Sequence, residues 1–248
     1  MSLHTTRPSR PFRLPSLLRC GYRSPVVTER LRRQGLSRPI HRTPEEVVAW
    51  FGAMQAQEYE PATWAIGLRM KGDPVSTDVE RAVDDGRVVR THVMRPTWHF
   101  VSRADIRWLL QLTAPRVHQA MSGYRRKLEL DARVLVRCCT LFERALDGRR
   151  FLLRAELAER LARAKLPMTG VRLAMAVMYA ELEGVICSGP RRDRKFTYAN
   201  LGDRAPSAAP FDRDQALAEL FTLWDRLPEA VKAGFLATAR ALATEVPR

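Results

Sequence analysis

Two glutamines stand close together in the segment Met54-Gln55-Ala56-Gln57, directly after a run of apolar residues. Gln55 follows Phe51 by four residues, so helical spacing would place its amide on an apolar face. A buried amide must be hydrogen-bonded or must line a pocket. Gln55 and Gln57 are therefore candidate site residues. The alternative, which is the commoner case, is that they bond the loose backbone carbonyls at a helix end.

Acidic and histidine side chains follow this segment and could exchange protons with a substrate. Glu58 and Glu60 are candidate general bases, and their alternative role is solvated charge at the start of the next helix. His92 and His99 lie on two predicted strands, where histidines are more often structural than catalytic. The predicted turn between these strands carries Arg95 and Thr97. The sequence shows no Ser/His/Asp set, phosphate-binding loop or Gly-x-Gly-x-x-Gly motif.

The elements that must position these residues are predicted to be mainly helical. Thr43-Pro44-Glu45-Glu46 is typical of a helix start, with a threonine cap, a proline in the first turn and acids at the positive end. Pro61 predicts the start of a second helix, and Ser76-Thr77 caps a third. Residues 87–101 are rich in β-branched and aromatic side chains with Arg95-Pro96 near the middle, which predicts two strands around a turn. Three helices followed by a hairpin are typical of a winged helix.

The same order recurs later in the chain. Helices are expected over residues 103–118, 131–147, 154–164 and 171–183, with short strands at 185–187 and 196–198. The loop 188–195 between these strands contains four basic residues and one acid, so its charge is +3. Two helices joined by a tight turn and followed by a basic hairpin indicate a winged helix-turn-helix. The helix at 171–183 is apolar nearly all round, so we expect it to be buried and unable to read bases.

Charge favours a nucleic-acid partner. The chain has 42 basic and 27 acidic residues, and all but five of the basic ones are arginine, which gives a net charge of +15. Such an excess favours a polyanion, and DNA is the default. We expect salt-sensitive contacts with DNA phosphates from the basic residues of the 188–195 loop, which are Arg191, Arg192, Arg194 and Lys195. The alternative is a basic protein with no such partner.

Other features exclude further classes of protein. No apolar run approaches the roughly 18 residues of a membrane-spanning helix, so no membrane partner is expected. Cys20, Cys138, Cys139 and Cys187 lack metal-ligand spacing, and we expect no metal, no cofactor and a reducing cytoplasmic location. The predicted fold class is mainly α with small β-hairpins, arranged as tandem winged helix-turn-helix modules. We divide the chain into a disordered Arg- and Pro-rich tail at 1–24, a first module at 25–118, a second module at 119–202, and a linker with a C-terminal helical segment at 203–248.

Three segments, Trp50–Glu58, Arg90–Phe100 and Ala180–Gly189, carry a family resemblance in their residues and order. Together they resemble the AlkZ/YcaQ-type bacterial DNA glycosylases, which are built from tandem winged helices. Members of that family remove alkylated bases, including N7-alkylpurines and some interstrand crosslinks. Their catalytic signature is Gln-x-Gln or Gln-x-Asp, and Gln55-Ala56-Gln57 matches it. The resemblance thus implies that Gln55 and Gln57 are catalytic and that duplex DNA, alkylated or crosslinked, is the partner.

The implied chemistry needs no strong base. An N7-alkylated purine carries a positive charge and leaves the sugar as a neutral molecule, so the enzyme need only position a water and tolerate an oxocarbenium-like centre. A glutamine oxygen accepts a hydrogen bond from water but takes no proton near pH 7. We expect the residues His92, Arg95, Thr97 and His99 to contact substrate or DNA beside the glutamines. We further expect a monomer associated with the bacterial nucleoid.

The sequence departs from the family pattern at two places. It has Arg95-Pro96-Thr97 where many members have Arg-Gly-Thr, and proline stiffens a hairpin tip. The region that corresponds to a third winged helix is short, so we expect a C-terminally truncated relative. Whether the chain is an enzyme therefore stays open. The alternatives are a non-catalytic winged-helix DNA-binding protein and an inactive truncated remnant.

Overall fold

The computed structural model describes residue 11, residues 24–206 and parts of the C-terminal segment, namely residues 218, 221–229, 231–234 and 236–237. The chain divides into two compact units, Met1–Ala208 and Ala209–Arg248. The predicted tail, except for Pro11 and Ser24, lies outside the described residues, as does most of the predicted C-terminal segment. All of the site residues predicted from the sequence belong to the first unit.

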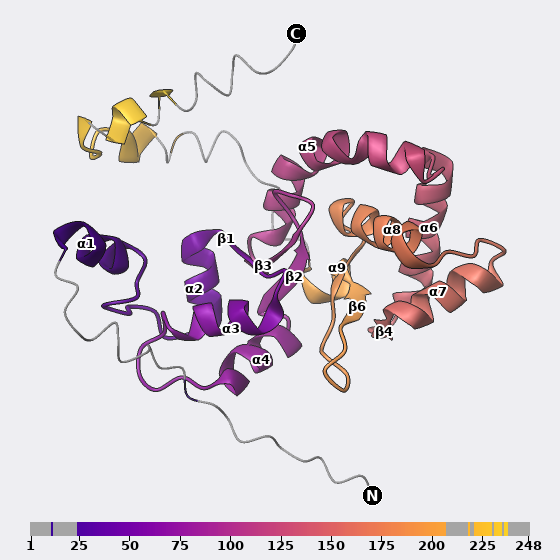
Figure 1. Cartoon of the computed structure of the whole chain (residues 1–248), viewed down its shortest axis with the longest axis horizontal. Helices are drawn as coiled ribbons and strands as arrows, with labels where there is room; N and C mark the ends of the chain where they lie inside the picture. The colour runs from indigo at the N-terminus through magenta and orange to yellow at the C-terminus, as the bar shows by residue number, and fades with distance from the viewer. Residues whose placement is uncertain are drawn as a thin grey trace, which may run out of the picture. The chain divides into compact units, whose positions relative to one another are not determined.

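The first module contains three helices and a small antiparallel sheet (Figure 1). Its elements in chain order are α2 (Pro44–Phe51), β1 (Ala53–Gln55), α3 (Tyr59–Gly67), α4 (Ser76–Asp84), β2 (Val88–His92) and β3 (Trp98–Ser102). Strand β3 lies in the middle of the sheet and pairs with β1 on one side and β2 on the other. A further helix, α1 (Pro25–Arg33), precedes the module. The predicted hairpin is thus present, and β1 adds a third strand to it.

The sequence of α2 explains where this helix begins and ends. The Thr43 side chain accepts the N–H of Glu46, and the Glu46 carboxylate accepts the N–H of Thr43, which satisfies two donors of the first turn. The helix ends at Phe51 because Gly52 adopts a φ of 73°, a conformation that glycine enters at little cost. The prediction that helical spacing continues to Gln55 is therefore wrong. Gln55 lies on β1, where successive side chains alternate between the two faces.

The second module repeats the element order of the first. Its elements are α6 (Ala132–Leu146), β4 (Leu152–Leu153), α7 (Arg154–Arg163), α8 (Gly170–Leu182), β5 (Ile186–Ser188) and β6 (Thr197–Asn200). Strand β6 is central, with β4 and β5 on its two sides. Strand β4 was not predicted, because two residues are too few to show alternation. The predicted fold class, mainly α with small β-hairpins, is confirmed.

Helix α8 is the centre of the core of the second module. Most of its residues are buried, namely Leu173, Met175, Ala176, Val177, Met178, Ala180, Glu181 and Leu182. Phe142 and Leu146 of α6 and Leu157 and Leu161 of α7 pack in the same core and are fully buried. Burial of each such side chain contributes roughly 1.5–3 kcal/mol. The prediction that α8 is an interior helix is therefore confirmed.

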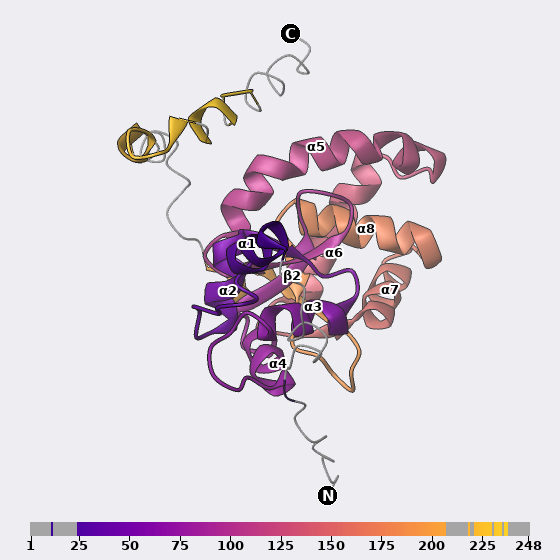
Figure 2. The ribbon, with the colours of Figure 1, turned by 60° about the vertical axis from the view of Figure 1, so that its left-hand side comes forward.

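Helix α5 (Ile106–Lys127) connects the two modules along the chain (Figure 2), and hydrogen bonds of side chains also join them. The boundary predicted at residue 118 therefore falls inside this helix. The short helix α9 (Leu201–Arg204) ends at Arg204, whose guanidinium donates to the carbonyls of Asp84 and Val83 at the end of α4. None of the described helices combines the length and apolar composition that crossing a membrane requires.

Candidate active site on the first module

Gln55 and Gln57 lie on one side of an extended segment, with Ala56 between them on the other side. Ala56 is fully buried in the core of the first module, whereas both glutamines are exposed. The N–H of Ala56 donates to the carbonyl of Trp98 at 2.8 Å, which continues the pairing of β1 with β3 by one residue. Because side chains two residues apart on a strand point to the same side, the amides of Gln55 and Gln57 lie on the same side of the segment.

A row of polar side chains crosses the sheet beside Gln55. The pairing of the strands places Gln55 opposite His99, and His99 opposite Thr91. His99 is only 3% exposed, and its Nδ1 lies 2.9 Å from the carbonyl oxygen of Thr97. A carbonyl only accepts, so Nδ1 carries the proton and the neutral ring keeps a lone pair on Nε2. The hydroxyls of Thr91 and Thr97 are buried and have no hydrogen-bond partner within the described structure.

Burial keeps the His99 ring uncharged. Burial is the largest cause that lowers the pKa of His99, and the neighbouring Arg95 and His92 lower it further. The bond to the Thr97 carbonyl raises this pKa, but it does not outweigh burial. At neutral pH this site therefore offers a neutral imidazole and two amides, all of which can accept a hydrogen bond from water.

The tip of the hairpin approaches both glutamines. Arg95 is exposed, and its Nη2 donates to Oε1 of Gln55 at 3.4 Å. The N–H of Trp98 donates to Oε1 of Gln57 at the same distance. On the other side of the tip, the N–H of Met94 donates to the Thr113 hydroxyl of α5 at 3.0 Å. The structure thus brings together five of the predicted residues: Gln55, Gln57, Arg95, Thr97 and His99.

His92 stands apart from this group. Its side chain is 5% exposed, and its Nδ1 contacts a carboxylate oxygen of Glu181, which is itself buried on α8. Its ring packs against that of Trp98 with centroids 4.4 Å apart. His92 is an interior residue between the two modules, and it reaches the candidate site only through Trp98.

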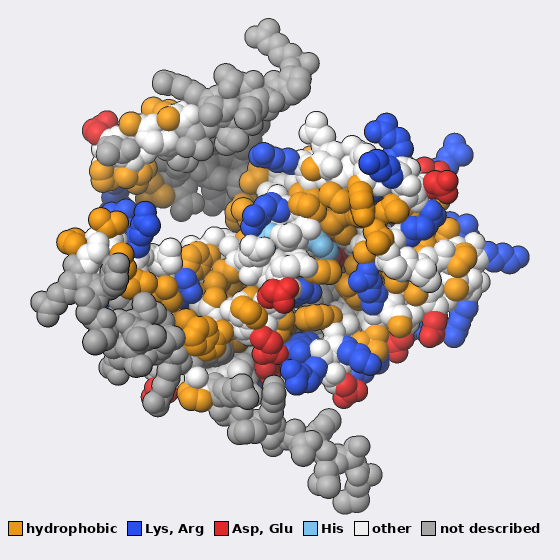
Figure 3. Space-filling view, viewed as in Figure 1, with side chains coloured by type: hydrophobic (Ala, Val, Ile, Leu, Met, Phe, Trp, Pro, Cys, Tyr) orange, Lys and Arg blue, Asp and Glu red, His pale blue; other side chains and the backbone are white. Residues whose placement is uncertain are grey.

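The basic residues of the 188–195 loop differ in their exposure and in the contacts that their charged groups make with the protein. The Arg191 side chain is 15% exposed and packs its guanidinium over the ring of Tyr59 at 4.3 Å. Arg192 forms an ion pair with Glu156 at 2.5 Å. Arg194 is 67% exposed, with Glu60 at 3.8 Å, and Lys195 is exposed. Lys and Arg side chains are spread across the face in Figure 3 rather than gathered over this loop.

The candidate bases Glu58 and Glu60 are both exposed. Glu60 lies within 3.9 Å of the guanidinium groups of Arg191 and Arg194, which places it at the basic loop. Among the residues that the structure describes, no three His, Cys, Asp or Glu side chains are grouped as a metal site would require.

A family model of AlkZ-like DNA glycosylases matches residues 48–227, which is most of the chain and includes the whole candidate site. The chain belongs to the AlkZ-like DNA glycosylase family. Its fold is similar to that of the DNA glycosylase AlkZ of Streptomyces sahachiroi, with a TM-score of 0.61 and 23% sequence identity. The similar region covers 72% of this chain and 49% of that one, so the chain spans about half the length of this relative. No curated protein matches the sequence.

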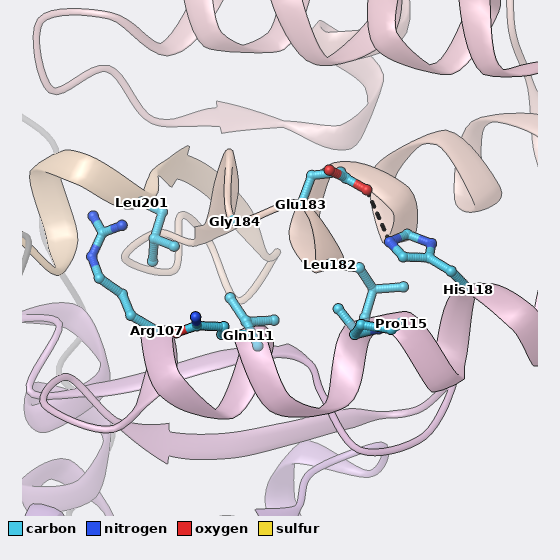
Figure 4. A pocket seen from close by; sticks show the side chains of 10 residues that line it. Arg107, Gln111, Pro115, His118, Leu182, Glu183, Gly184 and Leu201 are labelled. Carbon is cyan, nitrogen blue, oxygen red and sulfur yellow. Dashed lines mark ion pairs between the residues drawn. The ribbon is translucent and has the colours of Figure 1, made fainter. Parts of the chain in front are cut away.

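This AlkZ-like chain also has a cavity of about 360 Å³ away from the glutamines (Figure 4). It lies along α5, beside the end of α8, with an apolar floor that includes Leu182 and Leu201. His118 and Glu183 form a pair across one side, with Nε2 and Oε1 3.0 Å apart. Arg107 lies on the other side and donates to the carbonyl of Ala205. None of the residues predicted as site residues lines this cavity.

Sequence reasoning missed one residue of the candidate site, Arg90. Its guanidinium donates to the carbonyls of Ala56 and Gln57, at 2.9 and 3.4 Å, and it is 5% exposed. A signal was present, because Arg90 interrupts the β-branched run Val88–Thr91 of a predicted strand, which the structure shows to be buried. A charged residue in such a strand needs bonding partners inside the protein.

Proposed function

We propose that this AlkZ-like protein is a monofunctional DNA glycosylase that removes cationic alkylated purines from duplex DNA by hydrolysis. One observation carries the proposal: Gln55 and Gln57 present their amides on the same side of an extended segment, beside a neutral His99 and the exposed Arg95. The membership of a glycosylase family makes bond cleavage at a base the reaction that this arrangement best serves.

The reaction that we propose breaks the bond between C1′ of the sugar and N9 of an N7-alkylated purine. The purine takes the bonding electrons and leaves as a neutral molecule, since it began with a positive charge. The oxygen of a water held by Gln55 and Gln57 then bonds to C1′, and the proton of that water passes to solvent. Hydrogen bonds that orient this water lower the barrier by positioning it, without proton abstraction by an amide.

We further propose that the duplex binds through its phosphates, which contact Lys195 and the 67% exposed Arg194 of the 188–195 loop. Helix α8 corresponds in order to the helix that reads bases in a helix-turn-helix, but it is buried. Because the buried α8 cannot read bases, we propose that the protein binds DNA independently of base sequence. We also propose that it acts as a monomer at the bacterial nucleoid. The same observation disfavours the alternative of a sequence-reading regulator.

Release of free base from a defined duplex tests the proposal. Purified protein is incubated with a duplex that contains N7-methylguanine, and free base is measured beside an undamaged duplex and one that contains uracil. We expect release from the methylated duplex alone, since uracil is neutral and its bond is not weakened in advance. Duplex binding without release would identify a non-catalytic DNA-binding protein or an inactive remnant, and would overturn the proposal.

A further inference from the structure

Arg90 is a buried cation without a carboxylate partner. It is 5% exposed and forms no ion pair with any described residue. Burial is the largest cause that lowers the pKa of Arg90, and nearby Glu181 raises it in part without forming an ion pair with Arg90. Its side-chain hydrogen bonds go instead to the carbonyls of Ala56 and Gln57, the second half of the Gln-Ala-Gln segment. An unpaired buried charge is costly, so these bonds and its packing must hold it in place.

The second module supplies two of the contacts of Arg90, from Phe196 and Ser188. The guanidinium lies between two aromatic rings, with Trp98 of the hairpin and Phe196 of the second module each 4.3 Å from it. Its own backbone N–H donates to the hydroxyl of Ser188 on β5 at 2.8 Å. A planar guanidinium can stack its face on an aromatic ring while it donates hydrogen bonds in its own plane, whereas an ammonium has no planar face to stack.

A second contact from the second module reaches the same segment through Trp98. Glu181 of α8 contacts His92, and the His92 ring packs on Trp98. Trp98 accepts the N–H of Ala56 and donates to the side chain of Gln57. The backbone of Ala56 and Gln57 is therefore bonded by Arg90 and Trp98 together, and each of them is in turn packed by residues of the second module.

We infer that Arg90 is a positioning residue, through which the second module fixes the direction of the Gln55 and Gln57 side chains. Arg90 acts on the carbonyls behind the two amides and does not itself reach the substrate. A shift of about 1 Å in a positioned group can cost about 100-fold in rate. The inference rests on the proposed function for its kinetic test, but its structural part stands by itself.

The kinetic test compares two arginines that bond backbone carbonyls. Arg103 donates to the carbonyls of Gly86 and Asp85, at 3.0 and 3.3 Å, away from the glutamines. For Arg90→Ala we expect a single-turnover excision rate about 10- to 100-fold lower, with duplex affinity nearly unchanged. Added methylguanidinium, at matched ionic strength, should restore part of this rate. For Arg103→Ala we expect the parental rate and no response to methylguanidinium. Equal losses in both variants, or a parental rate in Arg90→Ala, would overturn the inference.

Hydrogen exchange tests the structural part without any activity. The N–H of Ala56 is bonded to Trp98 and should exchange at least about 10-fold faster in Arg90→Ala, because the carbonyls beside it lose their donors. Phe196→Leu keeps an apolar side chain and removes only the stacked ring, so it serves if Arg90→Ala does not fold. It should raise exchange at Ala56 in the same direction, while Arg103→Ala should not. An unchanged exchange rate at the Ala56 N–H in both the Arg90→Ala and the Phe196→Leu variant would contradict the inference. A parental protein that exchanges as expected but releases no base would reject only the proposed function.

Discussion

The two modules have the same order of elements, but they present different residues at matching positions. The first strand of the first module leads into Gln55 and Gln57, which are exposed, whereas the matching strand of the second module is Leu152–Leu153, which is half-buried. The hairpin of the first module ends in exposed Arg95, while the hairpin of the second has two of its arginines packed or paired. The two modules thus share one topology, but the first presents the candidate site residues and the second packs against the residues that support them.

The third helices of the modules differ as well, and neither suits base reading. Helix α8 is buried by its own apolar sequence. Helix α4 carries three acids, of which Asp84 is exposed and Asp78 and Glu80 are half-buried, against the single base Arg81, and this excess of negative charge repels phosphates. The comparison teaches that an element order shared with DNA-reading proteins does not by itself identify a reading helix. The side chains on the outer face decide it.

The largest expected effect is a loss of excision rate when the glutamines, which only the first module presents at this position, are replaced. Gln55→Ala and Gln57→Ala should each lower the single-turnover excision rate by about 100-fold, because each removes a hydrogen-bond acceptor for the water. Duplex affinity should stay nearly constant. Gln119→Ala, an exposed glutamine on α5, is the matched control and should keep the parental rate. A Gln57→Ala protein that excises N7-methylguanine at the parental rate would move the mechanism to Glu58 or Glu60.

The next effect separates Arg194 and Lys195 of the basic loop from Arg191 and Arg192, whose guanidinium groups are held more closely by the protein. Each phosphate contact contributes about 0.9 to the slope of log affinity against log salt concentration. Replacing Arg194 and Lys195 by Ala should therefore reduce this slope by up to about 1.8, which is about tenfold in affinity over a fourfold change in salt. Replacing Arg191 and Arg192 by Ala should change it less, since both are packed or paired inside the protein. Equal slopes for the two double variants and the parent would remove the loop from the interface.

A smaller effect concerns pH and is confined to the first module. The pKa of His99 is lowered by burial, so between this value and the usual 6.5 the unfolded chain binds more protons than the folded one. The free energy of unfolding should fall as the pH drops below about 6.5, and less so in His99→Gln. The excision rate should be flat from about pH 7 to 8, where His99 is neutral. A rate that changes across that range would indicate a different titrating group.

The smallest expected effect is on the stability of the first module, through the cap of α2, the helix that precedes the glutamine segment. Thr43→Ala removes the side-chain oxygen that accepts the N–H of Glu46 and should lower the free energy of unfolding by about 1 kcal/mol. Thr43→Ser keeps the acceptor and should cost much less. Denaturant unfolding measures both. Equal stability of the two variants would show that the cap contributes nothing measurable.

Local patterns were enough to predict most of the fold, since caps, periodicity and the β-branched run each act within a few residues. The cap at Thr43, the hairpin of β2 and β3 and the burial of α8 follow from such patterns. The end of α2 could not be predicted, because Gly52 is compatible with either a continued helix or a left-handed turn. The glutamines were found from their types, and the family resemblance supported them. Arg90 was not found, because its partners Ala56 and Gln57 lie more than thirty positions away in sequence and its partner Ser188 lies on the other module.

The contacts that join the modules have a consequence for synthesis on the ribosome. The chain could close the core of the first module as soon as β3 emerges. The partners of Arg90 and His92 come later, since Ser188 and Glu181 lie 98 and 89 positions further along, and Arg204 reaches back 120 positions to the end of α4. A nascent chain that ends before these residues holds the Gln-Ala-Gln segment without its supports. The candidate site is therefore among the last parts of the protein to mature, although its own residues are among the first to be translated.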